Sequence, residues 1–180
     1  MIFNPRKIRL YFILSSLLFT AFIGNAHVGE HPSVHDTVAG IIDRFRKTIP
    51  LQELMGMDIT KVKSLLTEKE RHILGTQHIT FRVNVPVKVI IIRDAAMGDK
   101  PFWLKERGFT PMGFKITLQG TEVDFWMKDF EKGQIGLGVN SLTGGNTHYI
   151  AALMPLKKDT KLEVTELYPG QLRVGALKDG

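Results

Sequence analysis

The hydrophobic period of the chain changes near residue 76, and this change restricts the folds open to it. Upstream, apolar residues recur at the spacing of a helix face. Downstream, Ile79, Phe81, Val83 and Val85 alternate with polar residues, as in a half-buried strand. A helical segment followed by a series of strands predicts a β-rich fold, because a parallel α/β sheet requires helices between its strands.

The upstream segment predicts short helices with identifiable ends. Ser33 precedes an apolar stripe that runs from Val34 to Phe45, and Asp36 lies three residues after Ser33, which is the spacing of an N-terminal capping pair. Pro50 is expected to end this helix, since proline cannot continue the hydrogen-bond ladder.

Two further helix starts follow in the same segment. Asp58 is a cap residue ahead of an apolar run, and Thr67 with Glu70 repeats the capping pattern. Gly75 is expected in the left-handed conformation that commonly follows a helix.

From residue 76 onward, strand-like runs recur with glycine, proline and asparagine between them. The fold class expected is mainly β: an antiparallel β-sandwich of about eight strands with a short α-helical N-terminal segment. One short helix, over 101–107 and ended by Gly108, interrupts the series. The expected strands are 79–85, 87–92, 114–119, 122–128, 134–139, 148–154, 162–167 and 171–177.

The first 26 residues have the order of a cleavable signal peptide. Arg6, Lys7 and Arg9 precede an apolar run over 10–24, and Gly24-Asn25-Ala26 offers small residues before a cleavage point. The run is shorter than the roughly 20 residues of a spanning helix. The organisation expected is therefore a signal peptide at 1–26, a helical lead-in at 27–75 and a β-sandwich domain at 76–180. The protein is expected to be exported to the periplasm or secreted, with no membrane span after cleavage.

Charge and cysteine content exclude several classes of partner and site. The net charge is +6, but without the three basic residues of the leader it is +3, from 21 basic and 18 acidic residues. A nucleic-acid interface needs denser basic clustering, so no nucleic-acid partner is expected. Without cysteine the chain has no disulfide and no thiolate metal site.

Three histidines near the predicted cleavage point are the candidate metal ligands. His27, His31 and His35 are spaced by four residues, which would align them on one helix face. Gly29 and Pro32 interrupt that helix, which favours a polar tail without a bound cofactor. The alternative is copper at His27: as a new N-terminus, its amino group and ring nitrogen suit Cu(II) together.

Motifs for covalent or phosphate chemistry are missing from the sequence. It has no G-x-S-x-G, no cysteine and no P-loop, so no catalytic residue is predicted. Gly133, Gly136 and Gly138 lie in a strand-like stretch, where close packing or a bulge explains them better than a phosphate loop.

Aromatic residues gather in the middle of the chain. An aromatic face on a sandwich would stack on sugar rings, which makes a carbohydrate a candidate ligand. Phe125 and Trp126 are adjacent, however, and adjacent strand residues point to opposite faces, so at least one of them belongs to the core.

Four segments resemble the front of large exported bacterial metallophosphoesterases of the purple acid phosphatase type. They are HPSVHDTVAGII (31–42), ERHILGTQHITFRVNVPVKV (70–89), FWLKERGF (102–109) and ELYPGQ (166–171). The resemblance implies an N-terminal accessory region that precedes a fibronectin-like domain and a two-metal phosphatase domain.

The metal-binding motifs of that family are not carried over. Gly98-Asp99 and the stretch from Gly145 to His148 contain fragments of them, but Thr147 interrupts the second and no Asp-x-His precedes either. The expected function is a non-catalytic accessory domain whose partner is a downstream phosphoesterase domain. The alternative is a self-contained exported β-sandwich that binds a carbohydrate or another envelope ligand.

Overall fold

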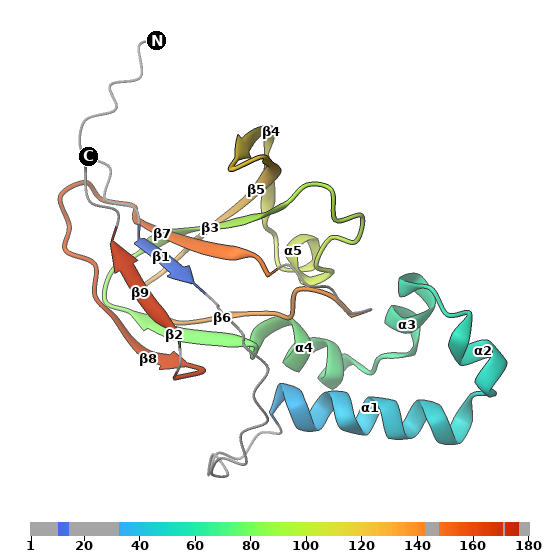
Figure 1. Cartoon of the computed structure of the whole chain (residues 1–180). Coiled ribbons are helices and arrows are strands. Elements are labelled where there is room, and N and C mark those ends of the chain that lie inside the picture. The colour runs from blue at the N-terminus through green and yellow to red at the C-terminus, as the bar shows by residue number, and fades with distance from the viewer. Residues whose placement is uncertain (1–10, 15–32, 143–147, 171, 177–180) are drawn as a thin grey trace.

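The strands after residue 76 form two antiparallel sheets around one apolar core, with helices gathered at one end (Figure 1). The computed structural model describes residues 11–14, 33–142, 148–170 and 172–176. Its helices are α1 (Val34–Thr48), α2 (Leu51–Met55), α3 (Ile59–Leu65), α4 (Glu68–Thr76) and α5 (Trp103–Glu106). Its strands are β1 (Tyr11–Leu14), β2 (Ile79–Val83), β3 (Val87–Asp94), β4 (Thr110–Leu118), β5 (Thr121–Phe130), β6 (Gly133–Leu137), β7 (Ile150–Pro155), β8 (Val164–Tyr168) and β9 (Arg173–Ala176). The predicted mainly-β class is confirmed.

The two sheets differ in size. The larger has the strand order β4-β5-β3-β7-β1-β9, and the smaller has the order β6-β2-β8. All their pairings are antiparallel. The chain passes from the smaller sheet to the larger between β2 and β3, where Pro86 interrupts the alternating run.

The predicted helix starts are confirmed at the atomic level. The Ser33 hydroxyl accepts from the Asp36 backbone N–H, and the Asp36 carboxylate accepts from the Ser33 N–H, which completes a capping box. The Ser33 hydroxyl also donates to the Asp36 carboxylate at 2.7 Å, and this bond, together with the one from the Ser33 N–H, lowers the pKa of that carboxyl. Thr67 and Glu70 form the same box at α4, and Asp58 caps α3.

The helices are joined to one another by apolar and charged contacts. Ile41 and Phe45 of α1 belong to the shared core. Arg44 of α1 donates to the Glu70 carboxylate at 2.7 Å and to the Leu65 carbonyl at 3.1 Å. Arg44 therefore joins α1 to the end of α3 and the first turn of α4.

Gly75 corrects one prediction. It lies inside α4, not in a left-handed position after it. A Cβ at Gly75 would lie 3.2 Å from the Trp103 Cβ, so the glycine permits close packing of α5 on α4. Gly108, by contrast, follows α5 with φ of +75°, as the sequence predicts for a helix terminator.

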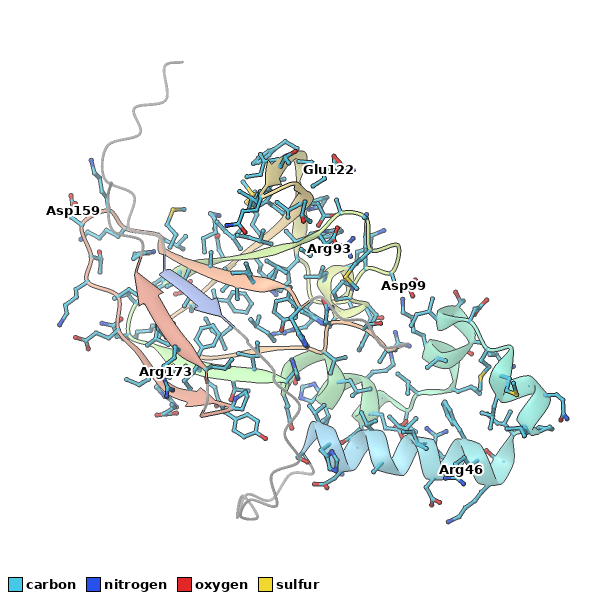
Figure 2. The ribbon with its side chains drawn as sticks, in the orientation of Figure 1. Arg46, Arg93, Asp99, Glu122, Asp159 and Arg173 are labelled. Carbon is cyan, nitrogen blue, oxygen red and sulfur yellow. The ribbon has the colours of Figure 1, made fainter. Side chains whose placement is uncertain are left out.

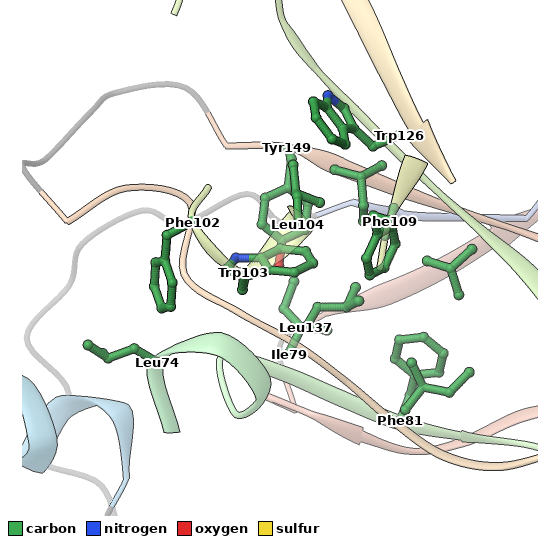
Figure 3. Packing of buried hydrophobic residues seen from close by; sticks show 14 of the residues in the cluster. Leu74, Ile79, Phe81, Phe102, Trp103, Leu104, Phe109, Trp126, Leu137 and Tyr149 are labelled. Atoms are coloured by element: carbon green, nitrogen blue, oxygen red, sulfur yellow. The ribbon is translucent and has the colours of Figure 1, made fainter. Parts of the chain in front are cut away.

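The core lies between the sheets and is capped by α5 (Figure 3). Trp103 is in edge-to-face contact with Phe109 and Tyr149, at centroid distances of 5.4 and 5.7 Å. Trp126 is 2% exposed, whereas its neighbour Phe125 is half-buried and belongs to a separate cluster. The prediction that at least one of this adjacent pair lies in the core is confirmed.

The predicted leader contributes to the larger sheet in the full chain. Tyr11–Leu14 forms β1, which lies between β7 and β9 (Figure 1). No helix among the described residues is both long and apolar enough to cross a membrane. Cleavage after residue 26 stays a prediction.

Candidate functional site

The predicted metal ligands are not brought together by the described part of the chain. His27 and His31 lie outside the described residues, and His35 is exposed in the first turn of α1. Within the described ranges, no three His, Asp or Glu side chains are grouped as metal ligands. The copper hypothesis at His27 stays untested.

The glycines of β6 make room for α4 and α5. A Cβ at Gly136 would lie 1.9 Å from the Thr76 carbonyl oxygen. A Cβ at Gly138, just after the strand, would lie 2.4 Å from the Trp103 ring. These contacts confirm the packing interpretation at both positions, and Gly133 instead begins the strand with φ of +134°.

Three polar side chains donate hydrogen bonds to backbone carbonyls in and around β6. Trp103 Nε1 donates to the Val139 carbonyl at 2.8 Å, and the Tyr149 hydroxyl donates to the Gly138 carbonyl at 2.7 Å. Arg107 donates to the Gly75 and Gly136 carbonyls, which joins α4 to β6. Burial lowers the pKa of Arg107 and raises the pKa of Tyr149. These interior polar groups hold backbone segments together.

A histidine pair lies beside this network. His78 precedes β2 and its backbone N–H donates to the Leu137 carbonyl at 3.0 Å. Burial lowers the pKa of the His78 imidazole, and the charge of His148 lowers it further. Seventy residues separate the two histidines in the sequence, and their proximity was not predicted.

Arg93, labelled in Figure 2, forms a buried ion pair and holds the loop after β3. The Arg93 side chain is 4% exposed and donates to the Asp124 carboxylate at 2.8 Å. Its other nitrogens donate to the Met97 and Asp99 carbonyls. The Gly98-Asp99 fragment of the family motif is therefore in a loop that Arg93 fixes through backbone contacts.

The larger sheet presents a second apolar surface away from the core. We call it the outer face. On three neighbouring strands it has a cluster in which Ile92, Val123 and Ala152 are buried and Ile90, Phe125 and Ile150 are partly buried. On β4, Phe114 meets Phe125 at a ring-centroid distance of 5.3 Å, and Ile116 is in register with Val123. Phe114, Ile116 and Leu118 are 49%, 41% and 44% exposed.

Charged side chains border the outer face without crossing it. Lys88 and Asp129, opposite each other on β3 and β5, form an ion pair at one end, and Asp94 lies toward the other. Lys88 and Asp94 are on the face of β3 that carries Ile90 and Ile92, because alternate strand residues share a face. The centre of the outer face is thus apolar and its ends are charged, which is typical of an interaction surface.

The distribution of apolar residues along β5 is a sequence signal for this surface. Strand β5 is apolar at Val123, Phe125 and Met127 as well as at Trp126 and Phe130, so neither of its faces reads as fully polar. A half-buried strand with one solvated face has polar residues at alternate positions. The sequence predicts only that at least one of Phe125 and Trp126 belongs to the core, and the structure places Phe125 and Phe114 outside it.

Comparisons with known proteins show no relative. No protein-family model matches the chain, and no curated protein or solved structure matches it.

Proposed function

We propose that the chain is a non-catalytic accessory domain of an exported protein and that the outer face is its docking surface. The observation that carries the proposal is the apolar outer face itself. Phe114, Ile116 and Leu118 are each more than two-fifths exposed, beside a cluster that the described residues only partly cover. Contiguous exposed apolar surface on a folded domain marks a site of association, because covering it removes that surface from water.

The partner that we propose is a phosphoesterase domain on the same polypeptide, downstream of residue 180. The resemblance of four segments to the front of purple acid phosphatase-type proteins supports this choice. Interfaces between domains of one chain are partly apolar with a polar border, and the outer face has that composition.

The gene beyond the codon for Gly180 provides the first test. A downstream domain with two-metal phosphatase motifs supports the proposal, and a stop codon contradicts it. If the domain is present, Ile116→Lys should lower the melting temperature of the two-domain protein while leaving that of the isolated chain unchanged. Met55→Lys is the matched control, because Met55 is 80% exposed on α2, far from the outer face. Equal effects of the two substitutions would remove the outer face from the interface.

The alternative function is a self-contained module that binds a carbohydrate or another envelope ligand. One observation favours it: the partly exposed rings of Phe114 and Phe125 lie side by side and offer apolar surface for stacking on sugar rings. Sedimentation with insoluble cellulose, chitin and peptidoglycan tests this function. Binding that is lost in Phe114→Ala and kept in Met55→Ala would establish the module, and no binding to any of the three contradicts it.

Export itself is tested by N-terminal sequencing of the protein recovered outside the cytoplasm. We expect His27 to be the first residue, from the signal-peptide pattern of residues 1–26. Recovery of intact Met1 in a membrane fraction would contradict this expectation.

A further inference from the structure

Strand β7 is flanked on one side by a segment that the proposed export would remove. In the full chain β1 pairs with β7 through Tyr11↔Leu153, Phe12↔Ala152 and Ile13↔Ala151, and it pairs on its other side with β9. Cleavage after Ala26 would take β1 away and leave one empty strand position between β7 and β9. We call this position the β7 slot.

Strand β7 has the composition of an interior strand. Ala151, Ala152 and Leu153 are at most 1% exposed, and β7 contains no charged residue. Its register with β3 is continuous, and its proline, Pro155, lies beyond the three positions that pair with β1. Nothing along those positions discourages the addition of another strand.

The opposite edge of the same sheet is built differently. Strand β4 contains Pro111 and Lys115, and its register with β5 shifts between these two residues. Proline, lysine and irregular pairing are the features by which natural edge strands avoid unwanted partners. The contrast shows that this sheet protects the β4 edge and leaves β7 dependent on a neighbour.

Strand β9 is a poor replacement for β1. To replace β1, β9 would have to move sideways by about 4.8 Å, which is the distance between neighbouring strands. Leu172, the residue before β9, is 6% exposed and belongs to the shared core, and its packing there opposes such a move. Because β7 and β9 are both antiparallel to β1, a shifted β9 would make a parallel pair with β7, unlike every other pair in the described sheets. Arg173 and Gly175 of β9 are also exposed, as suits an edge.

We propose that in the mature protein the β7 slot accepts an extended apolar segment of a partner protein, inserted antiparallel to β7. The chemistry of the occupant follows from the segment seated there in the full chain, Tyr-Phe-Ile-Leu, which is apolar at four successive positions. A strand between two others must be compatible with both faces of the sheet, and both faces of β7 are apolar. The inference rests on the proposed export only for the removal of β1.

The test uses residues 27–180 and a synthetic peptide with the sequence of residues 8–17. Among the side chains that the structure describes, every member of both buried clusters lies within residues 27–180. We expect saturable binding of the peptide and at least tenfold slower exchange of those amides among Ala151–Leu153 that point away from β3, because alternate residues of a strand bond to opposite neighbours. A control peptide with Phe12→Pro should have neither effect, because proline removes an N–H and is excluded from interior strands.

Three results would overturn the proposal. The first is that the peptide does not slow amide exchange in β7, and the second is that the proline peptide slows it equally. The third is that, without peptide, the β7 amides of residues 27–180 exchange as slowly as those of the full chain. Size-exclusion chromatography then identifies what covers β7, which is a second copy if the protein is dimeric and β9 if it is monomeric.

A variant of the full chain keeps the proposal falsifiable if residues 27–180 aggregate. Phe12→Pro in the full chain should speed amide exchange in β7 and leave Val123 and its neighbours in β5 protected. Unchanged exchange in β7 would show that β1 does not cover it. N-terminal sequencing tests export separately, and Ile116→Lys should leave peptide binding intact, because Ile116 is on β4 and two strands, β5 and β3, separate it from β7.

Discussion

The two faces of the larger sheet are both apolar, yet the described part of the chain covers only one of them. On the inner face, Ile91, Trp126 and Leu153 are at most 2% exposed and belong to the shared core. On the outer face, Phe125 is only partly buried and Phe114 is 49% exposed. Apolar composition therefore does not by itself identify the core face, and the uncovered face is the one that remains available to a partner.

The largest expected effect comes from truncating the inner face. Trp126→Ala should lower the free energy of unfolding by about 3–5 kcal/mol, because it removes a large buried ring and leaves a cavity. Phe125→Ala, one residue away on the outer face, should cost about 1 kcal/mol, the usual size for a point substitution. Urea unfolding of both variants measures the difference, and equal losses would mean that the outer face is packed as fully as the inner.

A second prediction concerns the packing of α4 against β6 of the smaller sheet. Gly136→Ala should cost about 3 kcal/mol, since its Cβ would lie 1.9 Å from the Thr76 carbonyl oxygen and backbone must move. Gly40→Ala is the control: nothing lies within 4 Å of its Cβ in α1, and alanine should stabilise the helix by up to about 1 kcal/mol. Thermal melting of the two variants is the measurement. A neutral Gly136→Ala would show that α4 is not held closely against β6.

The smallest expected effect is a pH dependence from the histidine pair. The folded pKa of His78 is lowered from 6.5 by burial and by His148, so the unfolded chain binds more protons below that pH. The contribution of His78 to stability is therefore fully present above pH 6.5 and is lost as the pH falls toward the folded pKa. Denaturant titrations at pH 7.5 and 5.5 should show a smaller loss for His78→Gln than for the natural chain. An identical loss in both proteins would place His78 in contact with solvent.

Residues that are close in the sequence predicted the helix ends. The features that the sequence did not predict depend on contacts between residues that are far apart in the chain. The capping boxes at Ser33 and Thr67 depend on residues three apart, so they are readable from the sequence. Gly75 was misassigned because its role depends on Trp103, which approaches only when α5 packs on α4.

The candidate surfaces were harder to predict for the same reason. The outer face depends on which side of the sheet the smaller sheet covers, and hydrophobic periodicity does not encode that choice. The pairing of His78 with His148, and the position of β1 between β7 and β9, join residues that lie far apart in the sequence.

The most direct test of the central claim is the hydrolysis of a phosphate monoester by purified residues 27–180 supplied with Fe, Zn or Mn. We expect turnover at background level together with a folded, β-rich circular dichroism spectrum. Two-metal hydrolysis needs ligands that converge on two ions about 4 Å apart. Interior polar side chains such as Arg107 and Tyr149 instead donate hydrogen bonds to backbone carbonyls. Metal-dependent turnover that disappears in His148→Ala, with the spectrum unchanged, would contradict the account and establish a catalytic site beside His78.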